Sequence, residues 1–282
     1  MRLVSYERQG KAGFGLVVGD GVVDLGVALG GRYADLKALL AADALSEARA
    51  CQGRSPDFAL SGVSLLPVIP NPGKIWCAGL NYGEHVQETG RQVTEQPMFF
   101  LRVADSQVGH GSAIPRPPES VKLDYEGEIA VVIGKSGRRI AEVDAWSHIA
   151  GYACYNDGSV RDWQMHTQQW CPGKNFWRTG GFGPWLVTAD EIAPGAVMTL
   201  VTRLNGTEVQ RATTEQLIHS IPRLIAYAST VAPLRPGDVI VTGTPGGIGA
   251  KRNPPLWMKA GDVVEVEVDR IGVLRNPIVD EG

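Results

Sequence analysis

The sequence predicts an α+β, mainly β protein in which a small amino-terminal α/β domain precedes a larger domain. Short strand-like segments outnumber helix-like segments along the chain, and the two kinds do not alternate regularly. The 35 glycines and 18 prolines also indicate many turns. Regular alternation of strand and helix is what a doubly wound parallel sheet requires. These observations therefore argue against that fold.

The first 69 residues are expected to form the small domain. Residues 3–8 and 13–26 alternate like strands, and Gly19-Asp20-Gly21 is typical of a hairpin turn. Residues 34–50 carry apolar side chains at helical spacing and predict one helix. Three prolines between residues 67 and 72 then indicate a linker, so the second domain should span residues 70–282.

The second domain is expected to contain mostly strands. Residues 123–135 predict a strand, 144–157 a helix running into a strand, 195–212 a hairpin turning at Asn205-Gly206, and 239–245 and 263–272 the closing strands. Residues 213–231 give the strongest helical pattern, with Thr213 or Thr214 as the N-cap.

Charge and composition limit the kinds of partner. A formal net charge of -3 gives no electrostatic attraction to nucleic acid or to an anionic membrane surface. No apolar run reaches the roughly 18 to 20 residues of a membrane span, and no signal peptide is visible. The four cysteines are widely spaced and predict free thiols in a reducing compartment. We therefore expect a cytoplasmic protein, and small anionic substrates remain possible because a local cluster of Arg and Lys can bind them at any net charge.

The chemically most informative segment is LDYEGEIAVVIG, residues 123–134. A strand has a period of two residues, so Glu126 and Glu128 point to the same face. Neighbouring buried carboxylates repel each other, and Mg²⁺ or Mn²⁺ would remove that conflict because both ions favour carboxylate oxygen. The other interpretation is a strand with one solvated face, whose glutamates face water. The segment alone does not decide between them.

Further candidates follow the next apolar stretch, where a strand is expected to break into a loop. Asp157 lies at that break and could complete a metal site, leaving other positions on the ion to substrate and water. Arg161 and Gln164 are three residues apart and would share one face of a helical turn. The planar guanidinium of Arg161 suits a substrate carboxylate. Its alternative role is a structural ion pair with Asp157 or Asp162.

Four stretches resemble the signatures of the fumarylacetoacetate hydrolase family. In chain order they are KIWCAGLNYGEHVQE, LDYEGEIAVVIGK, AGYACYNDGSVRDWQ, and LRPGDVIVTGTPGGIG with the trailing AGDVVEVEVDRIGVLRNPI. They cover about residues 70–279, which is almost all of the second expected domain. The resemblance implies a mixed β-sheet roll, a homodimer, and one Mg²⁺ or Mn²⁺ per subunit held by Glu126, Glu128 and Asp157.

The same resemblance gives roles to the remaining candidates. His85 and Glu88 lie three residues apart, so on a helix Glu88 can orient His85. The family role of this pair is to activate water from a mobile lid. Lys174 corresponds to a family lysine that faces the substrate. Thr244, in the T-G-T-P loop, would offer its hydroxyl and backbone N–H to a substrate carboxylate, and Tyr82 is also expected to bind substrate.

The implied activity is hydrolysis of a carbon–carbon bond in an acylpyruvate-type 2,4-dioxo acid from aromatic ring cleavage. The ion would act as a Lewis acid, His85 would deprotonate water, and Lys174 would stabilise the resulting enolate. The alternative uses the same site without water, to decarboxylate oxaloacetate or to isomerise a 2-hydroxyhepta-2,4-diene-1,7-dioate-type diacid. Residues 175–178 depart from the family pattern, which leaves the substrate open. A silent binding protein is a third hypothesis, disfavoured by the complete set of candidate residues.

Overall fold

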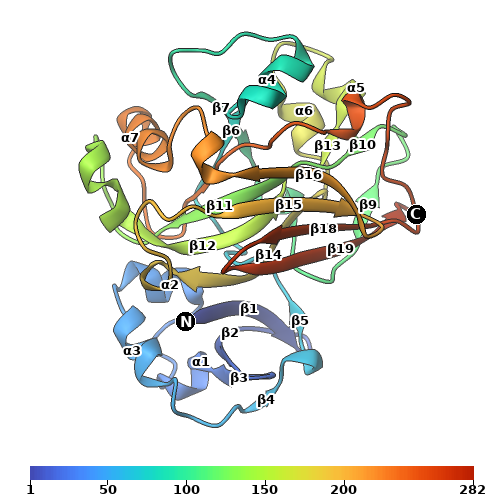
Figure 1. Ribbon diagram of the computed structural model, residues 1–282. Helices are drawn as coiled ribbons and strands as arrows, with labels where there is room; N and C mark the ends of the chain where they lie inside the picture. The colour runs from blue at the N-terminus through green and yellow to red at the C-terminus, as the bar shows by residue number, and fades with distance from the viewer.

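The computed structural model describes residues 1–282, and its amino-terminal part consists of short strands covered by short helices (Figure 1). The strands are β1 (Arg2–Arg8), β2 (Lys11–Val18), β3 (Gly21–Asp24), β4 (Phe58–Ala59) and β5 (Ser64–Leu65), and the helices are α1 (Leu25–Ala28), α2 (Leu36–Ala41) and α3 (Leu45–Ala50). The single helix predicted over residues 34–50 is therefore wrong. Asp43, with a φ of 54°, turns the backbone out of the helical conformation between α2 and α3.

The remainder of the chain is dominated by strands, as predicted. Its first half contains β6 (Ile75–Gly79), α4 (Gly83–Thr89), β7 (Met98–Arg102), β8 (Gln107–Val108), β9 (Ile114–Arg116), β10 (Leu123–Asp124), β11 (Gly127–Ile133), the 3₁₀-helix η3 (Glu142–His148), β12 (Ile149–Asn156), β13 (Ser159–Val160), α5 (Arg161–Gln164), α6 (Cys171–Lys174) and β14 (Gly180–Thr188). Its second half contains β15 (Thr199–Leu204), β16 (Thr207–Thr213), the 3₁₀-helix η5 (Thr214–Gln216), α7 (Ile221–Val231), β17 (Val239–Val241), the 3₁₀-helix η6 (Gly249–Lys251), β18 (Val263–Val268) and β19 (Gly272–Asp280).

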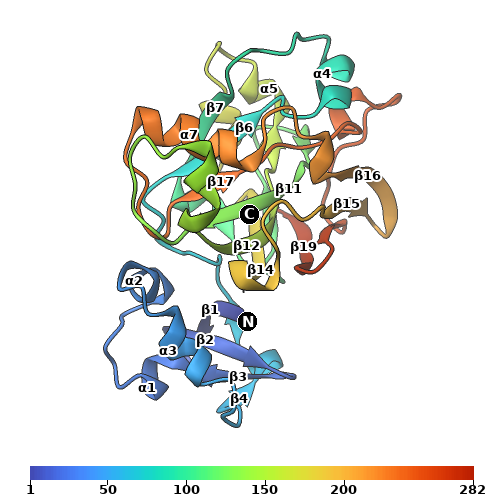
Figure 2. The same ribbon diagram turned by 60° about the vertical axis from the view of Figure 1, so that its left-hand side comes forward.

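The strands form one large sheet and two smaller ones. The large sheet has the order β4-β3-β2-β1-β14-β12-β11-β17-β6-β7, with β5 beside β1 and β8 beside β14. The second sheet has the order β16-β15-β18-β19-β9, and β10 pairs with β13. Strands of the amino-terminal part thus continue the large sheet through the β1–β14 pairing, below the rest of the molecule (Figure 2). The division near residue 70 stays a prediction.

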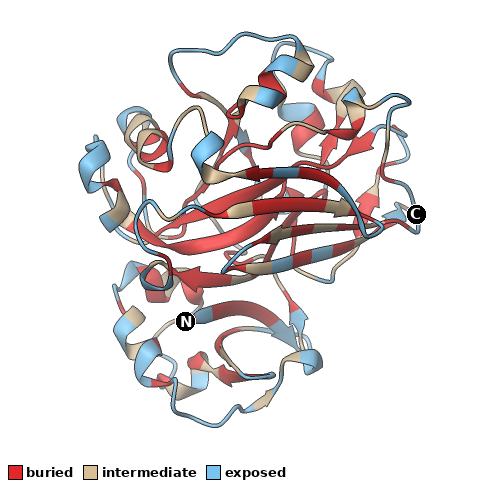
Figure 3. Ribbon diagram, viewed as in Figure 1, coloured by how far each residue is buried: buried red, intermediate tan, exposed pale blue.

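The central strands are buried on both faces (Figure 3). Because side chains alternate along a strand, β11 sends Ile129 and Val131 into a core shared with α7, β15 and β18. Its intervening residues, Ala130 and Val132, face a second core that α2 and the amino-terminal strands complete. Glu128 precedes these two on the same face, so the start of β11 brings a carboxylate to the edge of an apolar layer.

The predicted helix over residues 213–231 begins later than expected. Thr213 ends β16 and caps η5 in a capping box with Gln216, whereas Ser220 is the N-cap of α7. Pro222, in the first turn of α7, fixes that start. The predicted hairpin at Asn205-Gly206 is confirmed as β15 and β16. None of the helices is both long and apolar enough to cross a membrane.

Candidate active site

Three buried carboxylates, which we call the carboxylate trio, meet at the start of β11. Glu126 and Glu128 flank Gly127, and Asp157 follows β12, the neighbouring strand. The Asp157 backbone N–H donates to the Glu126 carbonyl at 2.8 Å, which holds the two segments in register. One ligand oxygen from each member of the trio lies within 4.8 Å of the others, and all three side chains are buried. The interpretation that the glutamates face water is therefore wrong.

Three cations surround the trio. The Lys174 ammonium lies 2.6 Å from Glu126 Oε2 and 2.7 Å from Asp157 Oδ2, and only 1% of this lysine is exposed. The Arg102 guanidinium, buried on β7, pairs with the other oxygen of Asp157. Arg161 Nη2 lies 2.7 Å from Glu126 Oε1. Glu128 has no cationic partner, and its Oε2 accepts the backbone N–H of Gly243.

The unequal distribution of cations separates the pKa values of the two glutamates. Burial opposes ionisation of Glu126, but Lys174 and Arg161 outweigh it and hold the pKa of Glu126 well below its usual value. Burial, followed by the charges of Asp157 and Glu126, raises the pKa of Glu128 well above its usual value. Glu128 is thus the member of the trio whose negative charge is least compensated by the protein.

The donor set fits a hard divalent cation. The trio offers convergent carboxylate oxygens in a buried setting, which Mg²⁺ and Mn²⁺ favour. A dication would also supply the positive charge that Glu128 lacks. Glu126, Glu128 and Asp157 are therefore the residues that would hold such an ion, and Lys174 lies against the same oxygens.

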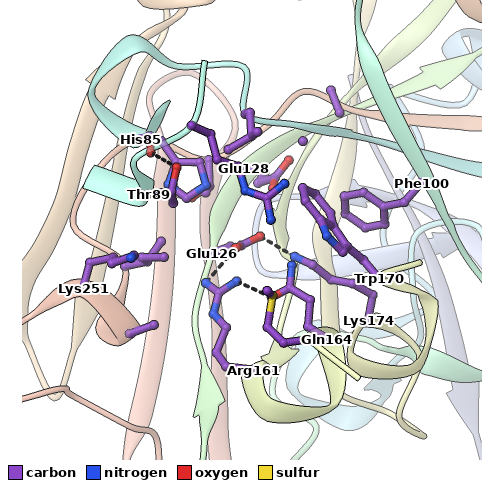
Figure 4. Close-up of a pocket in the computed structure, with 18 residues that line it drawn as sticks. His85, Thr89, Phe100, Glu126, Glu128, Arg161, Gln164, Trp170, Lys174 and Lys251 are labelled. Atoms are coloured by element: carbon purple, nitrogen blue, oxygen red, sulfur yellow. Dashed lines mark hydrogen bonds and ion pairs between the residues drawn. The ribbon is translucent and has the colours of Figure 1, made fainter. Parts of the chain in front are cut away.

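Glu126 and Glu128 of the trio line a cavity of about 290 Å³ (Figure 4). Phe100 and Trp170 form an aromatic wall with ring centroids 5.7 Å apart, and the Lys174 ammonium lies 4.9 Å from the Phe100 centroid. The other lining residues are Ala78, Gly79, Leu80, His85, Thr89, Arg91, Glu126, Glu128, Arg161, Gln164, Met165, Thr244, Ile248, Ala250 and Lys251. The cavity thus joins carboxylates, cations, one imidazole and an apolar wall.

His85 and Glu88 come together on α4, and His85 lines the cavity with Glu126 and Glu128 (Figure 4). His85 Nδ1 lies 2.7 Å from Glu88 Oε1, which confirms the predicted contact, and Glu88 Oε2 accepts the Gly247 N–H at 2.9 Å. In the neutral imidazole Nδ1–H donates to Glu88, so Nε2 keeps its lone pair. Because His85 lines the cavity and is buried, Nε2 is the nitrogen available as a base.

Arg161 and Gln164 share one end of the cavity, as their spacing predicts. Arg161 Nη1 donates to Gln164 Oε1 at 3.0 Å, and Arg161 Nε donates to Asp124 Oδ2 at 2.8 Å. The ion pairs of Arg161 are therefore with Asp124 and Glu126, not with the two aspartates considered from sequence. Its Nη2 lies 2.7 Å from Glu126 Oε1, and with one Nη2 N–H assigned to this ion pair the other remains available to a ligand.

Thr244 and Tyr82 differ from expectation in how they face the cavity. The Thr244 hydroxyl donates to the Gly127 carbonyl at 3.0 Å and accepts from Gln210 Nε2 at 2.8 Å, so it is already engaged. The backbone N–H of Thr244 has no partner within the protein. Tyr82 does not line this cavity but a separate pocket. Burial, with the charge of Glu128, raises the pKa of its phenol.

Three residues of this network were not identified from the sequence. Arg102 ends the apolar run MFFLR, and a lone cation at such a point was the available signal. Asp124 precedes Glu126 by two residues, so the same period-two reasoning could have included it. Gln210, on β16, accepts the Gly127 N–H at 2.9 Å and ties the second sheet to the trio. Nothing in the local sequence indicates that last contact.

Comparison with known proteins agrees with this geometry. Residues 74–279 match the family described as fumarylacetoacetate (FAA) hydrolase, C-terminal. The chain is 45% identical over 221 residues to a mitochondrial oxaloacetate tautomerase of Xenopus laevis, covering 78% of this chain and 69% of the relative. It is 38% identical over 287 residues to a mitochondrial oxaloacetate tautomerase of Rattus norvegicus, covering 99% and 92%.

A solved structure extends the likeness. Maleylpyruvate hydrolase from Sphingobium sp. SYK-6, in complex with manganese(II) ion and pyruvate, superimposes with a TM-score of 0.83 at 28% identity, covering all of both chains. The fold is thus the mixed, mainly β arrangement expected from the four sequence motifs. The family match extends over most of the chain and includes every element that contributes to the cavity. The chain belongs to the fumarylacetoacetate hydrolase family.

Proposed function

We propose that this protein is a divalent-metal-dependent enzyme that interconverts the keto and enol forms of a 2-oxo diacid of the oxaloacetate type. The observation that carries the proposal is one cavity lined by Glu126, Glu128, Lys174 and the base His85, with Asp157 behind it completing the trio. Tautomerisation needs one group to move a proton and another to hold the charge of an enolate. The two oxaloacetate tautomerases whose sequences are similar to this chain support the choice of reaction.

The substrate carboxylate would bind to donors that line the cavity and have no full set of partners within the protein. Those donors are the second N–H of Arg161 Nη2 and the unpartnered backbone N–H of Thr244. Both are suited to a carboxylate, because a guanidinium and a backbone N–H present hydrogen directly to its oxygens. Mg²⁺ or Mn²⁺, when held by the trio, would supply Lewis-acid chemistry toward the 2-oxo group.

The proton moves between carbon and oxygen. His85 Nε2 removes a proton from C3 of the substrate, and the electron pair of that C–H bond shifts to give an enolate with its charge on O2. Glu88 stabilises the imidazolium that forms, since it already accepts from Nδ1 at 2.7 Å. The Lys174 ammonium stabilises the enolate charge. Return of the proton to O2 completes the enol.

A second candidate is hydrolysis of a carbon–carbon bond in an acylpyruvate-type 2,4-dioxo acid. The specific observation in its favour is the same His85–Glu88 pair, which is equally suited to take a proton from water. The hydroxide adds to the distal carbonyl, the C–C bond breaks, and the products are a carboxylic acid and the enolate of pyruvate. The aromatic wall of Phe100 and Trp170 offers apolar contact to an acyl group. The maleylpyruvate hydrolase supports this candidate.

Product analysis distinguishes the candidates. The purified protein is incubated with Mn²⁺ or Mg²⁺ and either oxaloacetate or an acylpyruvate, and enol absorbance, pyruvate and carbon dioxide are followed. Metal-dependent approach of oxaloacetate to its keto–enol equilibrium, without carbon dioxide, is the expected result. Release of carbon dioxide would instead identify a decarboxylase, and cleavage of the acylpyruvate alone would identify the hydrolase. No reaction with any of these substrates would overturn the proposal.

We also propose that the protein acts as a cytoplasmic homodimer. The dimer is what the family resemblance implies, and the four free cysteines support a reducing compartment. Light scattering coupled to size-exclusion chromatography measures the mass directly. Twice the chain mass of 30.2 kDa is expected, and a monomer at micromolar concentration would contradict the dimer.

A further inference from the structure

One glycine-rich loop, residues 242–250, donates backbone N–H groups to carboxylates from three separate parts of the site. Gly243 donates to Glu128 of the trio, and Gly247 donates to Glu88 at 2.9 Å. Gly249 and Ala250 both donate to Asp124, at 2.8 and 2.9 Å. The first two carboxylates belong to the metal site and to the base. The third, Asp124, has no part in the chemistry described above.

Asp124 is completely buried, and each of its two carboxylate oxygens accepts two hydrogen bonds. Oδ1 accepts from the Gly249 N–H and from the Tyr125 N–H, the latter at 2.9 Å. Oδ2 accepts from the Ala250 N–H and from Arg161 Nε at 2.8 Å. Four donors on two oxygens require a carboxylate, because the amide nitrogen of an asparagine would face donors at one of the two positions.

The closeness of the loop to this carboxylate depends on a glycine. A Cβ added to Gly249 would lie 2.6 Å from Asp124 Oδ1 and 1.9 Å from the Leu256 carbonyl. Only glycine allows the backbone to approach so near. The loop that carries the free Thr244 N–H is therefore held at one end by the same side chain that holds the guanidinium of Arg161.

We propose that Asp124 is a positioning residue for recognition of the substrate carboxylate. It fixes Arg161 at a set distance from the loop that presents the Thr244 N–H, so that both donors meet one carboxylate. The inference rests on the proposed binding of a 2-oxo acid, but not on which reaction follows. Its consequence is that Asp124 and Arg161 act as one unit in binding, while the trio holds the metal independently.

The test measures binding of pyruvate, the simplest 2-oxo acid, by calorimetry in the presence of Mn²⁺. Asp124→Asn should raise the Kd for pyruvate about 10- to 100-fold, the effect of losing a charge-assisted hydrogen bond. The Kd of this variant for Mn²⁺ should stay within a few-fold of the Kd of the unaltered protein. Asp162→Asn is the matched control, because Asp162 lies beside Arg161 in α5 but accepts from Ser120 instead, at 2.7 Å. The control should leave both constants unchanged.

A double-mutant cycle separates positioning from a general structural role. If Asp124 acts through Arg161, introducing Asp124→Asn into the Arg161→Lys variant should raise the Kd for pyruvate by less than about threefold. Independent, multiplying effects would overturn the inference, as would an unchanged Kd in folded Asp124→Asn. If the Asn variant does not fold, Asp124→Glu carries the test: it keeps the charge, displaces Arg161 and should weaken pyruvate binding, and unchanged binding overturns the inference. Absence of 2-oxo acid binding by the unaltered protein would overturn the proposed function as well.

Discussion

Lys174→Met should make the metal-free protein less stable and its affinity for a divalent ion higher. The Lys174 ammonium lies 2.6 Å from Glu126 Oε2 and 2.7 Å from Asp157 Oδ2, in a setting closed to solvent. Removing one partner of a buried ion pair leaves uncompensated charge and costs about 3–5 kcal/mol. An ion held by the trio would share these carboxylates with the ammonium, so removing Lys174 also removes a repulsion on the ion. We expect Mn²⁺ to bind at least about tenfold more tightly, or ~1.4 kcal/mol.

The assay is urea unfolding with a chelator and with excess Mn²⁺, together with calorimetric titration of the ion. Mn²⁺ at about 100 times its Kd stabilises a protein by roughly 2.7 kcal/mol, so Lys174→Met should regain much of its lost stability. Lys251→Met is the control, because Lys251 lines the same cavity but is exposed and forms no ion pair. A metal-free Lys174→Met protein as stable as the unaltered chain, or one with weaker Mn²⁺ binding, would refute the reasoning.

Three further predictions concern the base, the protonation of the trio and its backbone. His85→Asn should lower turnover about 10²- to 10⁴-fold with Mn²⁺ affinity unchanged, since it removes a positioned base; turnover within twofold would exclude that role. Because the pKa of Glu128 is raised, the metal-free fold keeps a proton that the unfolded chain releases, so its stability falls as pH rises above the ordinary carboxylate range. Mn²⁺ must displace this proton, so it should bind more tightly as pH rises. Calorimetry in two buffers of different ionisation enthalpy measures the protons released on binding. Binding without proton release would contradict this prediction. Gly127→Ala should lower the free energy of unfolding in urea by about 1–3 kcal/mol, because the new Cβ would lie 1.9 Å from Thr202 Oγ1. Unchanged stability would show that β15, which carries Thr202, shifts without a measurable penalty.

The parts of the site that depend on local periodicity could be predicted from the sequence. Glu126 and Glu128 share a face because a strand repeats every two residues. His85 and Glu88 meet because residues three apart are neighbours on a helix. Both relations hold whatever the rest of the chain does. The convergence of Asp157 on the two glutamates required family resemblance as well, since strand pairing is not local.

What could not be predicted depends on contacts between distant segments. Arg102 meets Asp157 across 55 positions of sequence because β7, which carries Arg102, joins the same large sheet as β12, which Asp157 follows. The engagement of the Thr244 hydroxyl depends on Gln210, which arrives from another sheet. The helix boundaries were predicted wrongly for a different reason. The apolar pattern continues through Asp43 and Pro222, but Asp43 turns the backbone between two helices and Pro222 fixes the start of α7.

The central claim is that Glu126, Glu128 and Asp157 hold one divalent ion per chain. Calorimetric titration of chelator-treated protein with Mn²⁺, comparing the unaltered chain with Glu128→Gln, tests it most directly. Glu119→Gln, at an exposed glutamate ahead of β10, is the control. We predict one site per chain, lost or weakened at least about 100-fold, or ~2.7 kcal/mol, in Glu128→Gln alone. Absence of a site in the unaltered chain, or equal affinity in Glu128→Gln, would contradict the account.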